Sequence, residues 1–130
     1  MAIPPALAQH AEELRAATAL AVEINEADAR IYVVLRAVPL PPGRFRVAMT
    51  DVLFLADHQY PLSALDMFWT DVAVVRSDGS IPQNADSIET YLGRQWRRFS
   101  WHRNGAWDPA ANGLLDHFAV MEQRWAVEAP

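Results

Sequence analysis

The stretch that decides the fold covers positions 60–107 and reads YPLSALDMFWTDVAVVRSDGSIPQNADSIETYLGRQWRRFSWHRNGAW. It opens with Tyr60-Pro61, passes through an aromatic segment at 66–70 and closes with Trp107. Three of the five tryptophans of the chain lie between positions 96 and 107. Aromatic side chains are large and are usually buried at least in part. Their density therefore predicts a tightly packed, non-repetitive site or lid in this stretch.

The whole chain has the composition of a folded globular protein. Its 130 residues are 52% hydrophobic and 21% charged, which suits a single domain over residues 1–130 with a real core. The net charge of −5 argues against nucleic-acid binding, which normally needs a basic face. A local group of arginines could dock an acidic partner or a terminal carboxylate, or could form an ordinary solvated face. These arginines are Arg94, Arg97, Arg98 and Arg103.

The chain contains no cysteine, which excludes disulfides, thiolate zinc sites and cysteine nucleophiles. Asp57, His58 and His102 lack the spacing of a known metal motif, so we expect no metal, and nothing in the sequence implies a cofactor. Residues 1–5 lack the charged start and apolar run of a signal peptide. No apolar run approaches the roughly 18 residues that span a membrane. We therefore expect a soluble, cytoplasmic protein with no membrane partner.

Amphipathic helices are predicted near both ends of the chain. The first follows two prolines and runs from residue 6 to about 19, with Leu7 and Leu14 near one face. The second is predicted from apolar residues that recur at spacings of three, four and seven after position 114. It would begin with Asp108 as cap and Pro109 in its first position, or later at Asn112.

Between the helices, short apolar runs alternate with turn residues. Three prolines and a glycine at 39–43 cannot continue a strand, and the polar residues 25–28 also predict a turn. Residues 86–92 fit either a short helix or a loop with one turn. The order of elements predicts an α+β fold, an antiparallel β-meander of about four strands flanked by an N-terminal and a C-terminal helix. The expected strands or extended segments are 22–24, 31–35, 51–55, 65–69 and 72–75.

Several short motifs, in this order, resemble the ubiquitin-conjugating enzyme (UBC-like) fold. Tyr60-Pro61 before an apolar segment at 67–69 matches the Tyr-Pro step that leads into a long strand of that fold. Trp107-Asp108-Pro109 and the helix after it match the Trp, Pro and helix that follow the active-site region of the family. The chain is more closely similar to the prokaryotic members found beside bacterial ubiquitin-like proteins, over residues 24–125. The motifs that carry this closer similarity are PLPPG at 39–43, YP at 60–61, DMFW at 66–69 and WRRFSWH at 96–102.

The resemblance implies a role in a ubiquitin-like modification or assembly pathway. The partners it implies are a bacterial ubiquitin-like protein and an adenylating enzyme. The family's His-Pro-Asn motif and catalytic cysteine are missing, and the family's usual gap before Trp107 leads to residues 97–99. The chain is therefore interpreted as a catalytically silent, binding member that uses its first helix or the Trp96 to Trp107 region. The candidate partner-binding residues are Arg94, Trp96, Arg97, Arg98, Trp101, Arg103 and Trp107.

Two alternatives from other classes stay open. Ser100 and His102 lie two residues apart, so on an extended segment they would share a face and could form an oxyester-forming pair oriented by Asp108 or Asp116. An active transferase would also result if a cysteine has been replaced in this version of the chain. The simpler interpretation is that Ser100 and His102 hydrogen-bond the backbone of a loop. The third alternative is an unrelated small-ligand-binding or structural domain whose aromatic cluster is only core.

Overall fold

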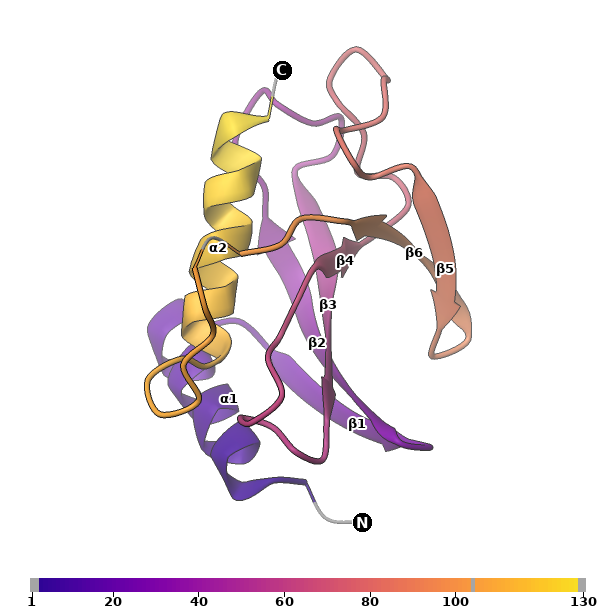
Figure 1. Ribbon diagram of the computed structural model, residues 1–130. Helices are drawn as coiled ribbons and strands as arrows, with labels where there is room; N and C mark the ends of the chain where they lie inside the picture. The colour runs from indigo at the N-terminus through magenta and orange to yellow at the C-terminus, as the bar shows by residue number, and fades with distance from the viewer. Residues whose placement is uncertain (1–2, 104, 129–130) are drawn as a thin grey trace.

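The computed structural model describes residues 3–103 and 105–128. A six-stranded sheet has the order β1-β2-β3-β4-β6-β5, with every neighbouring pair antiparallel. Both helices lie on one face of this sheet and contact each other (Figure 1). The α+β class and the flanking helices are confirmed. The elements are α1 (Pro5–Thr18), β1 (Val22–Ala27), β2 (Arg30–Pro39), β3 (Met49–Asp57), β4 (Phe68–Thr70), β5 (Ser87–Tyr91), β6 (Arg94–Phe99) and α2 (Leu114–Val127).

Helix α1 forms where its composition and apolar spacing predict it. Pro5 stands in the first turn, where its missing N–H removes no hydrogen bond. Leu7, Ala11 and Leu14 recur at helical spacing and are completely buried. The helix ends at Thr18, and Ala19, its C-cap, has a left-handed conformation and donates its N–H to the carbonyl of Arg15 at 2.8 Å. The C-terminal turn therefore follows the usual αL capping geometry.

Strands β1, β2 and β3 form the predicted meander, but they are longer than the sequence pattern suggested. Strand β1 continues to Ala27, so the turn at 25–28 was placed too early, and Asp28 turns the chain at a φ of 56°. Strand β2 ends at Pro39, as the proline-rich segment predicted. The loop that follows is closed by the Leu40 N–H, which donates to the Ala48 carbonyl at 2.9 Å.

The prediction of about four strands was wrong, because β5 and β6 form an additional hairpin. Residues 86–92, read as a short helix or loop, contain β5 instead. Leu92 and Gly93 make the two-residue connection, both with positive φ (54° and 73°), as tight hairpins require. Strand β6 then lies beside β4, which leaves β5 at the edge of the sheet. The segment 72–75, expected to be extended, forms no strand: residues 72 and 73 lie in a turn that the Val74 N–H closes on the Asp71 carbonyl at 3.1 Å.

The sheet separates two hydrophobic cores. Between the sheet and the helices lies the main core, which includes Phe54, Phe68, Phe99 and Trp125. Because side chains alternate along a strand, the intervening residues of the same strands face the other side. There they form a smaller, second core. Its buried members are Tyr32, Val34, Leu53, Trp69 and Trp96.

Helix α2 begins later than the Asp108-Pro109 motif suggested. Its first residue is Leu114, and the Gly113 N–H donates to the Asp116 carboxylate at 2.8 Å. Asp108 instead stabilises a separate turn, where its carboxylate accepts the Ala110 N–H at 3.0 Å. An acidic side chain in the first helical turn satisfies a free N–H and complements the helix dipole. No helix of the described chain is both long and apolar enough to cross a membrane.

Candidate functional site

The residues that the sequence places in one cluster lie on opposite faces of strand β6. Trp96 is 1% exposed and belongs to the second core, whereas Arg97 points to the helix side and is 6% exposed. The guanidinium of Arg97 donates to the Ala85 carbonyl at 2.7 Å and to the Val72 carbonyl at 3.0 Å. Burial lowers the pKa of Arg97. Both side chains are therefore buried within the fold in this conformation.

Arg94 lies on the face opposite the helices and is neutralised by neighbours. Its guanidinium forms salt bridges with Asp51, at 3.0 Å, and with Asp71. It also lies 4.1 Å from the ring centroid of Trp96 and so covers that ring. Arg36 joins the network through Asp51 at 2.9 Å. Burial would raise the pKa of Asp51, but the Ala37 N–H and the two guanidinium groups hold it below its ordinary value.

Arg98 and Ser100 belong to a second polar network on the same face. The carboxylate of Glu89 accepts hydrogen bonds from Trp69 Nε1 and from Arg98 Nη1, both at 2.8 Å. Arg98 Nε donates to Ser100 Oγ at 2.8 Å. The hydroxyl of Ser100 is therefore oriented by an arginine, and the guanidinium itself is paired with Glu89.

The segment that follows β6 brings His102 to the surface beside the 60–67 loop. The imidazole Nδ1 lies 2.8 Å from the carboxylate of Asp66, and the His102 side chain is 73% exposed. The carboxylate next to His102 is thus Asp66, whereas the sequence suggested Asp108 or Asp116. Those two carboxylates accept backbone N–H groups near the start of α2.

A groove lies between this segment and α2, with a volume of about 360 Å³. We call it the α2 groove. Its wall is aromatic and cationic at one end, where the Arg124 guanidinium stacks 3.6 Å from the ring centroid of Trp101. Val127, which also lines the groove, is 69% exposed. The groove is lined by Trp101, His102, Val120, Gln123, Arg124 and Val127.

A closed ring of four residues holds the wall of the α2 groove. Trp101 Nε1 donates to the Gln83 carbonyl at 2.9 Å, and the Gln83 N–H donates to the Glu128 carboxylate at 3.2 Å. Arg124 Nη2 donates to the same carboxylate at 2.7 Å and returns to Trp101 by stacking. Burial would raise the pKa of Glu128, but hydrogen bonds from Arg76, Gln83 and Arg124 lower it overall. The groove wall is therefore preorganised.

The Tyr60-Pro61 and Trp107 motifs meet in space. Trp107 Nε1 donates to the Pro61 carbonyl at 2.8 Å, and the rings of Tyr60 and Trp107 lie 6.2 Å apart. The Arg103 guanidinium lies 5.1 Å from the centroid of the Trp107 ring. His10 Nδ1 lies 2.6 Å from the buried hydroxyl of Tyr60, whose pKa is raised by burial. These contacts join three parts of the chain, which are α1, the 60–67 loop and the segment that precedes α2.

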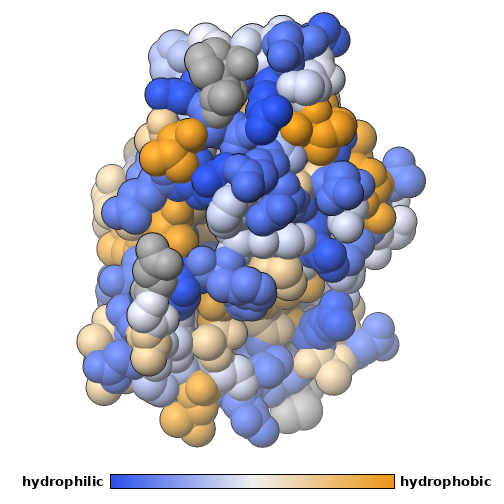
Figure 2. All heavy atoms as spheres, turned by 45° about the horizontal axis from the view of Figure 1, so that its top comes forward, coloured by the Kyte–Doolittle hydropathy of each residue, from blue (hydrophilic) through white to orange (hydrophobic). Residues whose placement is uncertain are grey.

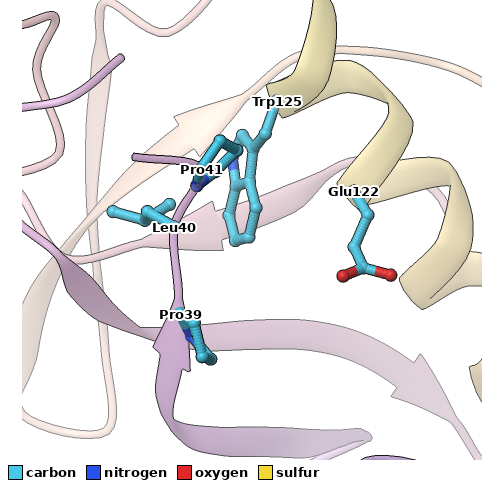
Figure 3. A pocket seen from close by; sticks show the side chains of 5 residues that line it. All are labelled: Pro39, Leu40, Pro41, Glu122 and Trp125. Atoms are coloured by element: carbon cyan, nitrogen blue, oxygen red, sulfur yellow. The ribbon is translucent and has the colours of Figure 1, made fainter. Parts of the chain in front are cut away.

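The remaining surface offers smaller features. Apolar side chains gather only in small patches among hydrophilic residues on the face shown in Figure 2. A hollow of about 220 Å³ lies between the proline-rich turn and α2, with Trp125 beside Pro41 and Glu122 on the helix side (Figure 3). Within the described residues, no group of three histidine, aspartate or glutamate side chains could hold a metal ion.

The comparison with known families agrees with the fold and motifs. The family described as prokaryotic E2 family E matches residues 7–128, which span the sheet and both helices. The chain belongs to this family. No curated protein and no solved structure matches the chain. Although the chain belongs to a prokaryotic E2-like family, it contains no cysteine, the residue on which thioester chemistry depends.

Sequence reasoning missed two parts of the site. Asp66, the partner of His102, was present in the DMFW motif, but no local pattern pairs residues 36 positions apart. The ring through Gln83 and Glu128 also joins distant segments and carries no sequence signature. Of the predicted residues, the structure brings Trp101 and His102 together on one groove, whereas Arg94 and Arg98 face the other side of the sheet.

Proposed function

We propose that this member of prokaryotic E2 family E is a binding protein that has lost thioester chemistry. Its partners would be a bacterial ubiquitin-like protein, an adenylating enzyme, or both, in a cytoplasmic modification or assembly pathway. The observation that carries the proposal is a family fold without any cysteine in 130 residues. Serine and histidine are much poorer acyl carriers at neutral pH unless they are activated. Membership of the family also argues against an unrelated structural domain.

The α2 groove supports the proposal as the contact surface. It combines an aromatic wall, exposed apolar groups and hydrogen-bonding groups, which is the composition of a protein-binding site. The ring through Glu128 holds Trp101 and Arg124 in place before any partner arrives. Preorganisation of this kind reduces the entropy that binding would otherwise lose. The segment that we propose for this groove is the C-terminal tail of the ubiquitin-like protein.

The test is complex formation with the ubiquitin-like protein and adenylating enzyme from the same genome, measured on a sizing column and by calorimetry. Val127→Asp should weaken binding by roughly tenfold, about 1.4 kcal/mol, because it places a charge at an exposed apolar position of the groove. Met49→Asp is the matched control, since Met49 is 57% exposed at the start of β3 and away from the groove. Absence of any complex with the unmodified chain would refute the proposal.

The Asp66–His102 pair favours a second candidate, an oxyester-forming transferase. In that reaction Ser100 Oγ would attack the C-terminal acyl adenylate of the ubiquitin-like protein, AMP would leave, and His102 would accept the hydroxyl proton. Ser100 Oγ accepts a hydrogen bond from Arg98 on the face opposite the helices, whereas His102 lines the α2 groove, so this reaction would require the segment after β6 to rearrange. Intact mass decides between the candidates. An adduct that resists thiol reductant, yields to hydroxylamine and is absent in Ser100→Ala would establish the transferase.

A further inference from the structure

The basic side chains of this protein are all of one kind. The sequence holds eleven of them and each is an arginine, so its 130 residues present no lysine ε-amine. Arginine and lysine are not chemically equivalent. The guanidinium stays protonated and is not a nucleophile at neutral pH, whereas a lysine amine has a readily available neutral, nucleophilic form.

The contacts in the structure explain why some positions require arginine. They do not explain why the surface has no lysine at all. Arg36 forms ion pairs with both Glu23 and Asp51, and Arg97 donates to two carbonyls. A lysine ammonium cannot reproduce these contacts, because they depend on the planar, forked geometry of the guanidinium group. Other positions have no such requirement. Arg46 is exposed, and the exposed helical positions of Gln9 and Gln123 would accept lysine, which forms helices as well as glutamine does. The fold therefore does not require the absence of lysine.

The absence matters because of the chemistry of the proposed partner. An activated C-terminal acyl group, as a thioester or an adenylate, reacts with amines. The amine nitrogen attacks the carbonyl carbon, the C–S or C–O bond breaks, the thiolate or AMP leaves, and the ammonium proton goes to solvent. A protein that binds such a donor raises the local concentration of its own nucleophiles to the millimolar range. Any exposed lysine near the groove would then compete with the true acceptor.

We infer that the lysine-free surface keeps this protein from being acylated by the activated ubiquitin-like protein that it holds. The inference rests on the proposed function and extends it, because it describes a binding surface that presents a reactive acyl group without consuming it. The α2 groove is the place where the protection is needed most. Gln123 lines this groove and is exposed, so an amine there would lie beside the bound tail.

The test uses two matched variants on the full chain. Gln123→Lys introduces an amine in the α2 groove, and Gln9→Lys introduces one on the exposed face of α1. Each variant and the unmodified chain are incubated with the mercaptoethanesulfonate thioester of the ubiquitin-like protein from the same genome. Intact mass and peptide mapping report amide-linked adducts. We expect Gln123→Lys to be acylated at position 123 about tenfold faster than Gln9→Lys at position 9, and no side-chain amide on the unmodified chain.

Two outcomes overturn the inference. Equal, slow acylation of both variants would mean that proximity to the bound donor creates no need for protection. Acylation of hydroxyl side chains on the unmodified chain, as fast as acylation of Gln123→Lys at position 123, would mean that the surface does not protect. A sizing column run on the same samples separates this failure from failure of the proposed function. If the complex persists while the two variants react equally, only the inference fails; if no complex forms, the proposed function fails as well.

Discussion

The indole Nε1 of Trp107 donates a hydrogen bond to the carbonyl oxygen of Pro61 at 2.8 Å, across 46 positions of sequence. This single contact ties the turn after β3 to the segment that enters α2. It brings the Tyr-Pro and Trp-Asp-Pro motifs together in space. Each motif presents its polar group to the other, and a half-buried carbonyl that lost this partner would be left poorly satisfied.

Replacing Trp107 by phenylalanine tests this contact. Trp107→Phe keeps an aromatic ring beside Tyr60 but removes the N–H, so we expect the free energy of unfolding to fall by about 1 to 2 kcal/mol in urea titrations. Trp101→Phe is the matched control, since its N–H donates to Gln83 at an exposed site and its loss should cost less. Unchanged stability of Trp107→Phe would contradict the structural role of the contact.

A second prediction concerns the arginine that the sequence assigned to docking. Arg97→Lys should lower the free energy of unfolding by about 1 to 3 kcal/mol, because an ammonium cannot serve the carbonyls of Val72 and Ala85 with the same planar geometry. Arg46→Lys makes the same change at an exposed position and should be near neutral. If Arg97→Lys instead weakens partner binding without loss of stability, Arg97 is a docking residue after all.

Local pattern was sufficient for the parts of the fold that are locally encoded. The buried spacing of Leu7, Ala11 and Leu14 and the β-branched run at the start of β2 identify elements whose burial is regular. Strand β5 was not predicted, because neither of its faces is fully buried. Ile88 and Thr90 alternate with Glu89 and give no clear apolar period. The Leu92-Gly93 turn was the available signal for that hairpin.

The site was harder to predict than the fold, because β6 sends neighbouring residues to opposite faces. Trp96 and Arg97 are adjacent in sequence, yet one enters the second core and the other points to the helix side. Counting aromatic and basic residues in a window ignores this alternation. The pairing of His102 with Asp66 depends on the closure of two distant loops, which no local rule contains.

A third prediction follows from the pKa of Glu128, which is held below its ordinary value of 4.5. A carboxylate with a lowered pKa in the folded state contributes stability above its unfolded pKa and loses it as the pH falls through the folded pKa. The stability difference between the unmodified chain and Glu128→Gln should therefore be largest near neutral pH and should shrink below pH 4.5. Urea titrations at several pH values measure it. A difference that is independent of pH would show that the carboxylate charge contributes nothing to the ring.

Glu122→Gln is the matched control for that experiment. It removes the same charge from an exposed position of α2, where no ring of hydrogen bonds depends on it. We expect it to change stability at neutral pH by no more than about 0.5 kcal/mol. Comparable losses in the two variants would attribute the effect to helix charge and not to the contacts of Glu128.

The last prediction concerns Gly113, the residue before α2, which lies against the side chain of His10 on α1. A Cβ at this position would lie 2.6 Å from Nδ1 of His10, although the backbone, with a φ of −160°, accepts any residue. Gly113→Ala should therefore displace the imidazole from Tyr60 and lower the free energy of unfolding by about 1 to 3 kcal/mol. In a His10→Ala background the clash is absent, and the same substitution should cost only about 0.5 kcal/mol, since alanine is a poorer N-cap than glycine. Equal costs in both backgrounds, measured as a double-mutant cycle, would place the penalty in the cap and not in the contact between the helices.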